Sequence, residues 1–117
     1  MDTATITNDA LISTLADDPD LIEIVELFVD EMTGRTAQLS SFFGGEDWEG
    51  LRRSAHQLKG AAGSYGFHPI SAAAAQLEDV VRAEEPEEII RQELEAVIDL
   101  CNRASAGTRQ LPLARLI

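Results

Sequence analysis

Apolar residues recur at intervals of three and four along most of the chain, and this spacing is the strongest constraint on the fold. The clearest run has steps of 3, 4, 3, 4 and 3 and consists of Trp48, Leu51, Ala55, Leu58, Ala62 and Tyr65. An α-helix with this pattern carries its apolar side chains on one face. The segment from about Glu46 to Tyr65 is therefore predicted to be an amphipathic helix that packs against other helices.

A second helix is predicted before this one. Asp18, Pro19 and Asp20 are interpreted as an N-cap followed by proline at the first helical position. The apolar residues that follow at helical spacing are Leu21, Ile24, Val25, Phe28, Met32, Leu39 and Phe42. Gly44 and Gly45 are expected to end this helix.

Two more helices are predicted after Gly66, which breaks the chain. The first has Pro69 in its opening turn and an alanine-rich stripe, typical of close helix–helix approach, made of Ile70, Ala73, Ala74, Leu77, Val80 and Val81. The second opens at residues 85–88, where acidic side chains favour a helix N-terminus. Its stripe is Ile90, Leu94, Val97 and Cys101.

Four long amphipathic helices joined by short loops predict an all-α fold, most simply an antiparallel four-helix bundle. Residues 8–15 predict a short extra N-terminal helix. We expect a single domain over residues 1–117, with its core at about residues 8–106. The C-terminal tail, residues 107–117, could pack on the bundle or stay loose.

Composition narrows the kinds of partner. The chain has 21 acidic and 9 basic residues and a net charge of −12, which argues against nucleic acid and anionic membranes as partners. It has no long apolar run, and its N-terminus lacks the basic start of a signal peptide. The single cysteine, Cys101, is expected in the core and cannot form an internal disulfide. We expect a cytoplasmic location.

The predicted helix over residues 46–65 carries an unusual second face. Arg52, His56, Lys59 and Gly63 lie on a flank about 100° away from the apolar stripe. Each glycine inside a helix costs about 0.8–1 kcal/mol relative to alanine. Gly60 points away from the apolar seam, which favours bare surface where a bulky group can approach His56. Gly63 could serve either access or close helix packing.

These residue types suit phosphoryl transfer. Neutral imidazole is a competent nucleophile near neutral pH. A phosphoryl group in transfer needs positioning and electrostatic stabilisation, which an ammonium one helical turn away supplies. Lys59 is the only lysine in the chain, and with Arg52 and Arg53 it forms a basic spot in an acidic protein.

Eleven residues, His56-Gln57-Leu58-Lys59-Gly60-Ala61-Ala62-Gly63-Ser64-Tyr65-Gly66, closely resemble the signature of histidine-containing phosphotransfer (HPt) domains. The shared elements are His, Leu at +2, Lys at +3 and Gly at +4, +7 and +10. The surroundings that agree are Asp18–Leu21, Phe28, Trp48 and Gln76–Glu78. The resemblance covers roughly residues 8–106.

The resemblance implies that His56 accepts a phosphoryl group from a receiver-domain aspartate and passes it to another receiver, using the ring nitrogen distal to the backbone. Lys59 would stabilise the phosphoryl oxygens, and Gly60 and Gly63 would give the receiver access.

The resemblance also implies a polar or basic side chain near the imidazole on the following helix. By position Glu78 and Arg82 face that way, with Arg82 the better phosphate partner. Glu78 could instead hydrogen-bond the proximal ring nitrogen and fix the tautomer. Arg52 is a further supporting candidate.

The implied partners are response-regulator receiver domains and hybrid sensor histidine kinases of two-component phosphorelays, and the protein would be a monomeric phosphoprotein. No bound cofactor or metal is expected, and Mg²⁺ would be supplied by the partner receiver. The chain has no glycine-rich nucleotide loop, so a kinase is not expected.

Two other functions remain open from the sequence. One is a module that docks receivers or another helical partner without carrying phosphate, and that would not need Lys59. The other is an unrelated enzyme with His56 as general base, for which the same stripe offers no second catalytic group. His68 is interpreted as a capping or loop residue, and the acidic residues 17–20 lack the pattern of a calcium loop.

Overall fold

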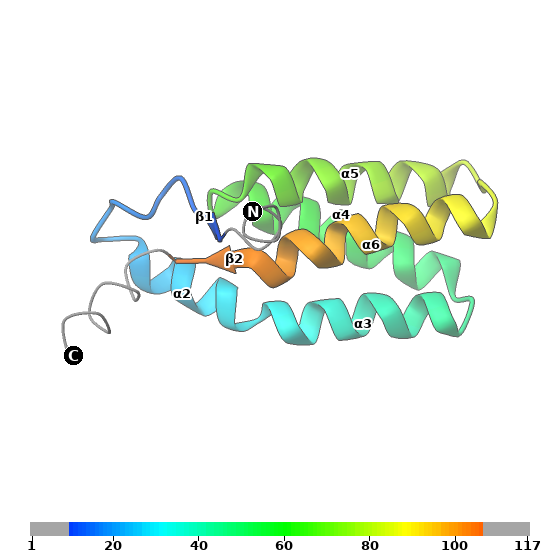
Figure 1. Cartoon of the computed structure of the whole chain (residues 1–117), viewed down its shortest axis with the longest axis horizontal. Helices are drawn as coiled ribbons and strands as arrows, with labels where there is room; N and C mark the ends of the chain where they lie inside the picture. The colour runs from blue at the N-terminus through cyan, green and yellow to red at the C-terminus, as the bar shows by residue number, and fades with distance from the viewer. Residues whose placement is uncertain (1–9, 107–117) are drawn as a thin grey trace, which may run out of the picture.

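The computed structural model describes residues 10–106, and helices dominate this part of the chain. Its helices are α2 (Ile22–Asp30), α3 (Met32–Gly44), α4 (Trp48–Ser64), α5 (His68–Arg82) and α6 (Glu87–Arg103). The last four form a ring of neighbours, in which α4 contacts α3 and α5, and α6 contacts α5 and α3. Figure 1 shows α3, α5 and α6 side by side along the long axis. The predicted helical bundle is confirmed.

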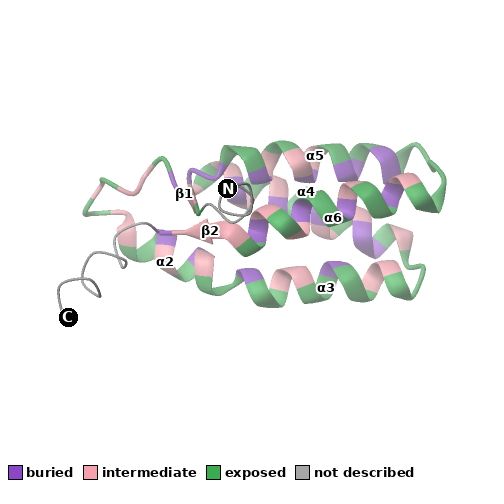
Figure 2. Ribbon diagram, in the orientation of Figure 1, coloured by how far each residue is buried: buried purple, intermediate pink, exposed green. Residues whose placement is uncertain are grey.

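The core is made by the apolar stripes that the sequence predicts (Figure 2). Its members from α4, α5 and α6 include Leu51, Ala55, Leu58, Ala62, Ile70, Ala74, Leu77, Ile90, Leu94, Val97 and Cys101. Burial raises the pKa of the Cys101 thiol to about 11, as expected for a core residue. Phe67, which no stripe included, is also fully buried and lies 5.5 Å from Phe28 between ring centroids.

Local signals set the ends of the later helices. The Asp47 side chain caps α4 by accepting a hydrogen bond from the Gly50 amide at 2.9 Å. Pro69 lies in the first turn of α5, and Pro86 is the N-cap of α6. A proline has no amide hydrogen to leave unpaired at a helix start, so both positions suit it.

The prediction of a short N-terminal helix over residues 8–15 is wrong for residues 10–15, the part of it that the structure describes. Instead, β1 (Leu11–Ile12) pairs in parallel with β2 (Ala104–Ser105), directly after α6. A helix this short is marginal in water, and here tertiary hydrogen bonds replace its own. Ser13 Oγ donates to the Tyr65 carbonyl at 2.6 Å, and the Thr14 amide donates to the Gly66 carbonyl at 2.9 Å.

Two predictions for the first long helix are also wrong. The helix begins at Ile22, and Asp18 instead accepts a hydrogen bond from the Asp20 amide at 2.9 Å within the preceding turn. The helix is also divided at Glu31 into α2 and α3, close to Thr33 and Gly34, which have low helix propensity. Ile24, which the stripe placed in the core, is exposed.

Asn8 and the predicted tail, residues 107–117, lie outside the described residues. Within residues 10–106, none of the helices is both long and apolar enough to cross a bilayer.

We predict that Gly66→Ala destabilises the protein by at least about 1–2 kcal/mol, because Gly66 has a φ of +83°. An added Cβ would also lie 2.9 Å from the Thr14 backbone nitrogen and so displace the segment that follows β1. The measurement is urea unfolding followed by circular dichroism. The control is Gly34→Ala, at an exposed helical position where a Cβ meets no atom within 4 Å, and it should be neutral or stabilising. Equal stability of the two variants would contradict this account.

Candidate functional site

The middle of α4 presents an accessible imidazole. The His56 side chain is 60% exposed, and Lys59 lies one turn further along the same face. A Cβ added at Gly60 would meet no atom within 4 Å, so this position is open surface. A bulky group can therefore approach His56 from the side of Gly60, as the sequence predicts.

Glu78 on α5 is the centre of the site. Its side chain is only 3% exposed. Its carboxylate oxygens lie close to three side chains from α4 and to one from α5. Oε2 is 3.0 Å from His56 Nδ1 and Oε1 is 3.2 Å from Lys59 Nζ. Arg82, one turn later on α5, donates through Nη2 to Oε2. Arg52 Nη1 approaches the same oxygen at 3.8 Å.

The charge on Glu78 is stabilised by these neighbours. Burial by itself raises the pKa of Glu78, because it removes water from the charged form. Hydrogen bonds from Lys59, Arg82 and His56 outweigh burial and hold the pKa of this carboxyl below its usual value. Glu78 is therefore ionised at neutral pH and acts only as a hydrogen-bond acceptor.

An acceptor at Nδ1 determines which nitrogen of His56 carries the proton. Because the Glu78 carboxylate cannot donate, neutral His56 holds its proton on Nδ1 and keeps a lone pair on Nε2. Nε2 has no hydrogen-bond partner among residues 10–106, and the exposed ring turns it toward solvent. The nitrogen that keeps an available lone pair is thus the one distal to the backbone.

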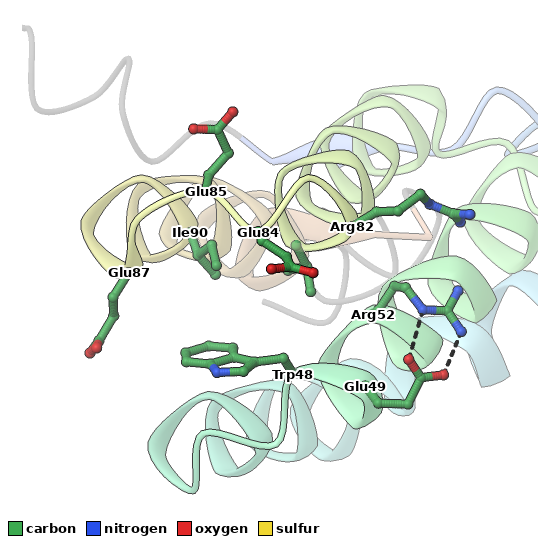
Figure 3. Close-up of a pocket in the computed structure, with 9 residues that line it drawn as sticks. Trp48, Glu49, Arg52, Arg82, Glu84, Glu85, Glu87 and Ile90 are labelled. Carbon is green, nitrogen blue, oxygen red and sulfur yellow. Dashed lines mark hydrogen bonds and ion pairs between the residues drawn. The ribbon is translucent and has the colours of Figure 1, made fainter.

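Arg52 is held in place by Glu49. Arg52 Nε donates to Glu49 Oε1 at 3.1 Å, and Arg52 Nη2 donates to Glu49 Oε2 at 2.6 Å (Figure 3). This bidentate pairing lowers the pKa of Glu49 and raises that of Arg52. Arg53 Nη1 also lies 3.8 Å from Glu49 Oε2. The four cations Arg52, Arg53, Lys59 and Arg82 and the two carboxylates Glu49 and Glu78 leave the neighbourhood of His56 with two net positive charges.

Gly63 is not open in the way that Gly60 is. A Cβ added at Gly63 would lie 3.4 Å from Ser71 Oγ on α5, and Ser71 itself donates to the Lys59 carbonyl at 2.8 Å. Of the two roles that the sequence left open for Gly63, close helix packing is the one that its contact supports.

The structure thus brings the predicted site residues together on α4 and α5. Sequence reasoning missed Glu49, although its spacing of three and four residues from Arg52 and Arg53 was a signal for ion pairs. It also missed Ser71, whose only signal is that it is a polar residue next to an alanine-rich stripe. His68 lies apart from the site, at the exposed start of α5.

Among residues 10–106, no group of three or more His, Cys, Asp or Glu side chains is placed to hold a metal ion.

A comparison with protein families identifies the domain. A family model described as the Hpt domain matches residues 23–107, which is most of the chain and includes every residue of the site. The chain belongs to the Hpt domain family. Hpt domains take part in His–Asp phosphorelays as phosphoryl carriers and are not kinases. No curated protein and no solved structure matches the chain.

The shifted carboxyl of this Hpt domain predicts a pH-dependent contribution to stability. Because the pKa of Glu78 is lowered on folding, its ionised form stabilises the fold above the ordinary carboxyl pKa of about 4.5, and this stabilisation is lost as the pH falls below that value. Glu78→Gln should lower the free energy of unfolding by roughly 1–3 kcal/mol at neutral pH. The deficit should shrink between about pH 5 and about pH 3.

Urea unfolding of the wild type and of Glu78→Gln, at neutral pH and at about pH 3, measures this deficit. Glu95→Gln is the control, because Glu95 is exposed on α6 and has no ion pair among the described residues. A Glu78→Gln deficit that does not change with pH would contradict the assignment of the stabilising charge to Glu78.

Proposed function

We propose that this Hpt domain carries a phosphoryl group on His56 Nε2 between receiver-domain aspartates of a two-component phosphorelay. The observation that carries the proposal is the pairing of His56 Nδ1 with buried Glu78, 3.0 Å away, which leaves Nε2 free on an accessible face. Lys59 beside the ring and open Gly60 support the same function.

In the proposed step, the Nε2 lone pair attacks the phosphorus of an aspartyl phosphate on the receiver. The Nε2–P bond forms as the P–O bond to the aspartate breaks, and the electron pair leaves with the aspartate as a carboxylate. The imidazole ring becomes positively charged, and the Nδ1–H···Glu78 hydrogen bond stabilises that charge. Transfer to a second receiver is the reverse step, with a new aspartate carboxylate as nucleophile.

Lys59 and Arg82 are the cations proposed to stabilise the phosphoryl oxygens. Both pair with Glu78, which also contacts the imidazole, and they come from different helices: Lys59 from α4 and Arg82 from α5. Their side chains are 38% and 60% exposed, so they can reach a group outside the bundle. This placement matters because phosphoryl transfer depends mainly on positioning and on stabilisation of negative charge.

The proposal extends to the partners. Response-regulator receivers, including those of hybrid sensor histidine kinases, would supply Mg²⁺ from their own acidic sites, and this domain would act as a cytoplasmic monomer over residues 1–117. Apolar surface for docking is present near α2, where Leu27 is 64% exposed and Ile24 is 42% exposed. Exposed Ile12 on β1 is a third apolar candidate.

We predict that a phosphorylated receiver with Mg²⁺ labels the wild-type protein and does not label His56→Gln. The amide of glutamine keeps a polar side chain on the exposed face but offers no nucleophilic nitrogen. Transfer of radiolabelled phosphate on a gel is the measurement. His68→Gln removes the only other histidine and should be labelled like the wild type. Labelling of a folded His56→Gln variant would contradict the proposal.

Lys59→Ala distinguishes a phosphoryl carrier from a module that only docks receivers. A carrier that loses Lys59 should transfer about tenfold or more slowly, because one cation no longer stabilises the transition state. Its Kd for the receiver should change by less than about threefold, since an exposed charge contributes little to docking. Rapid-quench transfer kinetics and titration calorimetry measure the two quantities. An unchanged transfer rate would favour the docking module.

A further inference from the structure

A cavity adjoins the site, between the start of α4, the end of α5 and the start of α6. Its volume is about 590 Å³. Trp48, Val81 and Ile90 give it apolar walls, and Glu84, Glu85 and Glu87 lie around it (Figure 3). Val81 and Ile90 are almost completely buried, so the bottom of the cavity belongs to the core.

The cavity has a negative charge that its own residues do not neutralise. Arg52 and Arg82 also line it, but each is paired with a carboxylate of the site, Glu49 and Glu78 respectively. Within residues 10–106, Glu84 and Glu85 have no ion pair at all.

Glu84 is the acidic residue best placed to meet a ligand. In Figure 3 its carboxylate is turned toward the space above the Trp48 ring, whereas that of Glu85 points away. The cavity therefore offers an indole ring, apolar walls and at least one unpaired carboxylate. A long side chain with an aliphatic stem and a cationic end fits this combination, and the indole face adds an attraction for the cation.

The cavity lies within reach of any protein that covers His56. Trp48 precedes His56 by eight residues on α4, which is about 12 Å along the helix axis. Arg52, halfway between them, belongs to both the cavity and the site. A protein interface of ordinary size covers about 800 Å² on each partner, equivalent to a disc of about 16 Å radius. A partner centred on His56 would thus also cover the cavity.

We propose that this cavity binds a lysine or arginine side chain of the receiver domain that docks on His56. The proposal rests on the function proposed above and adds the chemistry by which the partner is selected. The charge of the partner's side chain is opposite to that of the cavity and to the net charge of −12 of the whole chain. Such complementarity selects and orients a partner more than it adds affinity.

The backbone supplies a matched pair of test positions. Glu84 follows α5 with φ of 56°, and Glu46 follows α3 with φ of 58°. Each donates its amide to a carbonyl three residues earlier, at 3.0 Å and 3.1 Å respectively. Figure 1 shows the two turns at the same end of the bundle. Only Glu84 lines the cavity.

The test uses a receiver that labels His56 and compares Glu84→Gln with Glu46→Gln. Both variants lose one negative charge at the same end of the molecule and keep the same backbone strain. We expect Glu84→Gln to raise the Kd for the receiver, and the KM of transfer, about threefold to fivefold, with Glu46→Gln within about twofold of the wild type. The ¹H–¹⁵N signal of Trp48, the only indole in the chain, reports directly on the cavity during titration with unlabelled receiver.

Glu84→Gly is the control that separates weaker receiver binding from a folding defect. Glycine is favoured at this positive φ, so the variant should be at least as stable as the wild type and still bind the receiver more weakly. Equal Kd values for Glu84→Gln and Glu46→Gln, or a Trp48 signal that the receiver does not move, would overturn the cavity proposal while leaving the phosphoryl carrier intact. Failure of every receiver to label wild-type His56 would overturn the carrier function, and the cavity proposal with it.

Discussion

Glu78 is almost completely buried, and a carboxylate in such a place is stable only when cations and hydrogen-bond donors surround it. Here the partners come from two helices: His56, Lys59 and Arg52 from α4, and Arg82 from α5. The same contacts that satisfy the buried charge therefore join the two helices and fix the imidazole. Removing one partner would weaken both the helix pair and the site.

The close approach of α4 and α5 makes this arrangement possible. Gly63 leaves room for Ser71, and the Ser71 hydroxyl bonds to the backbone of α4 at Lys59. The alanine-rich stripe of α5 packs on the α4 stripe below the site. Since a hydrogen bond needs about 3 Å between heavy atoms, larger side chains at this contact would separate Glu78 from His56. The chemistry of the site thus depends on small residues in the core.

The parts predicted from the sequence are those in which a strong local pattern and the tertiary contacts agree. The α4 stripe gives both a buried face and the flank that carries His56 and Lys59. Positions on the next helix indicated Glu78 and Arg82. That Glu78 is buried and pairs with four side chains could not be predicted, because it depends on the distance between two helices rather than on the pattern of either one.

The errors lie where weak local signals compete with distant hydrogen bonds. The segment around Leu11 is predicted to be helical, but Ser13 and Thr14 bond to the turn at Tyr65 and Gly66, 52 residues away in sequence. Asp18 has the residue type of an N-cap, yet its side chain closes a turn before α2. A stripe of apolar residues across Glu31 did not reveal the break between α2 and α3, which lies close to the weak helix formers Thr33 and Gly34.

The proposed docking face has one positively charged region and one negatively charged region. The residues around His56 carry two net positive charges, and the cavity beside Trp48 adds unpaired carboxylates about two helical turns away. Arg52 and Arg82 lie between the two regions and are neutralised by Glu49 and Glu78. A receiver would present its own acidic, phosphorylated centre to the positive region and a basic side chain to the cavity. Two opposite charges at fixed separation define a direction, so the same face that accepts the phosphoryl group would also orient the partner that brings it.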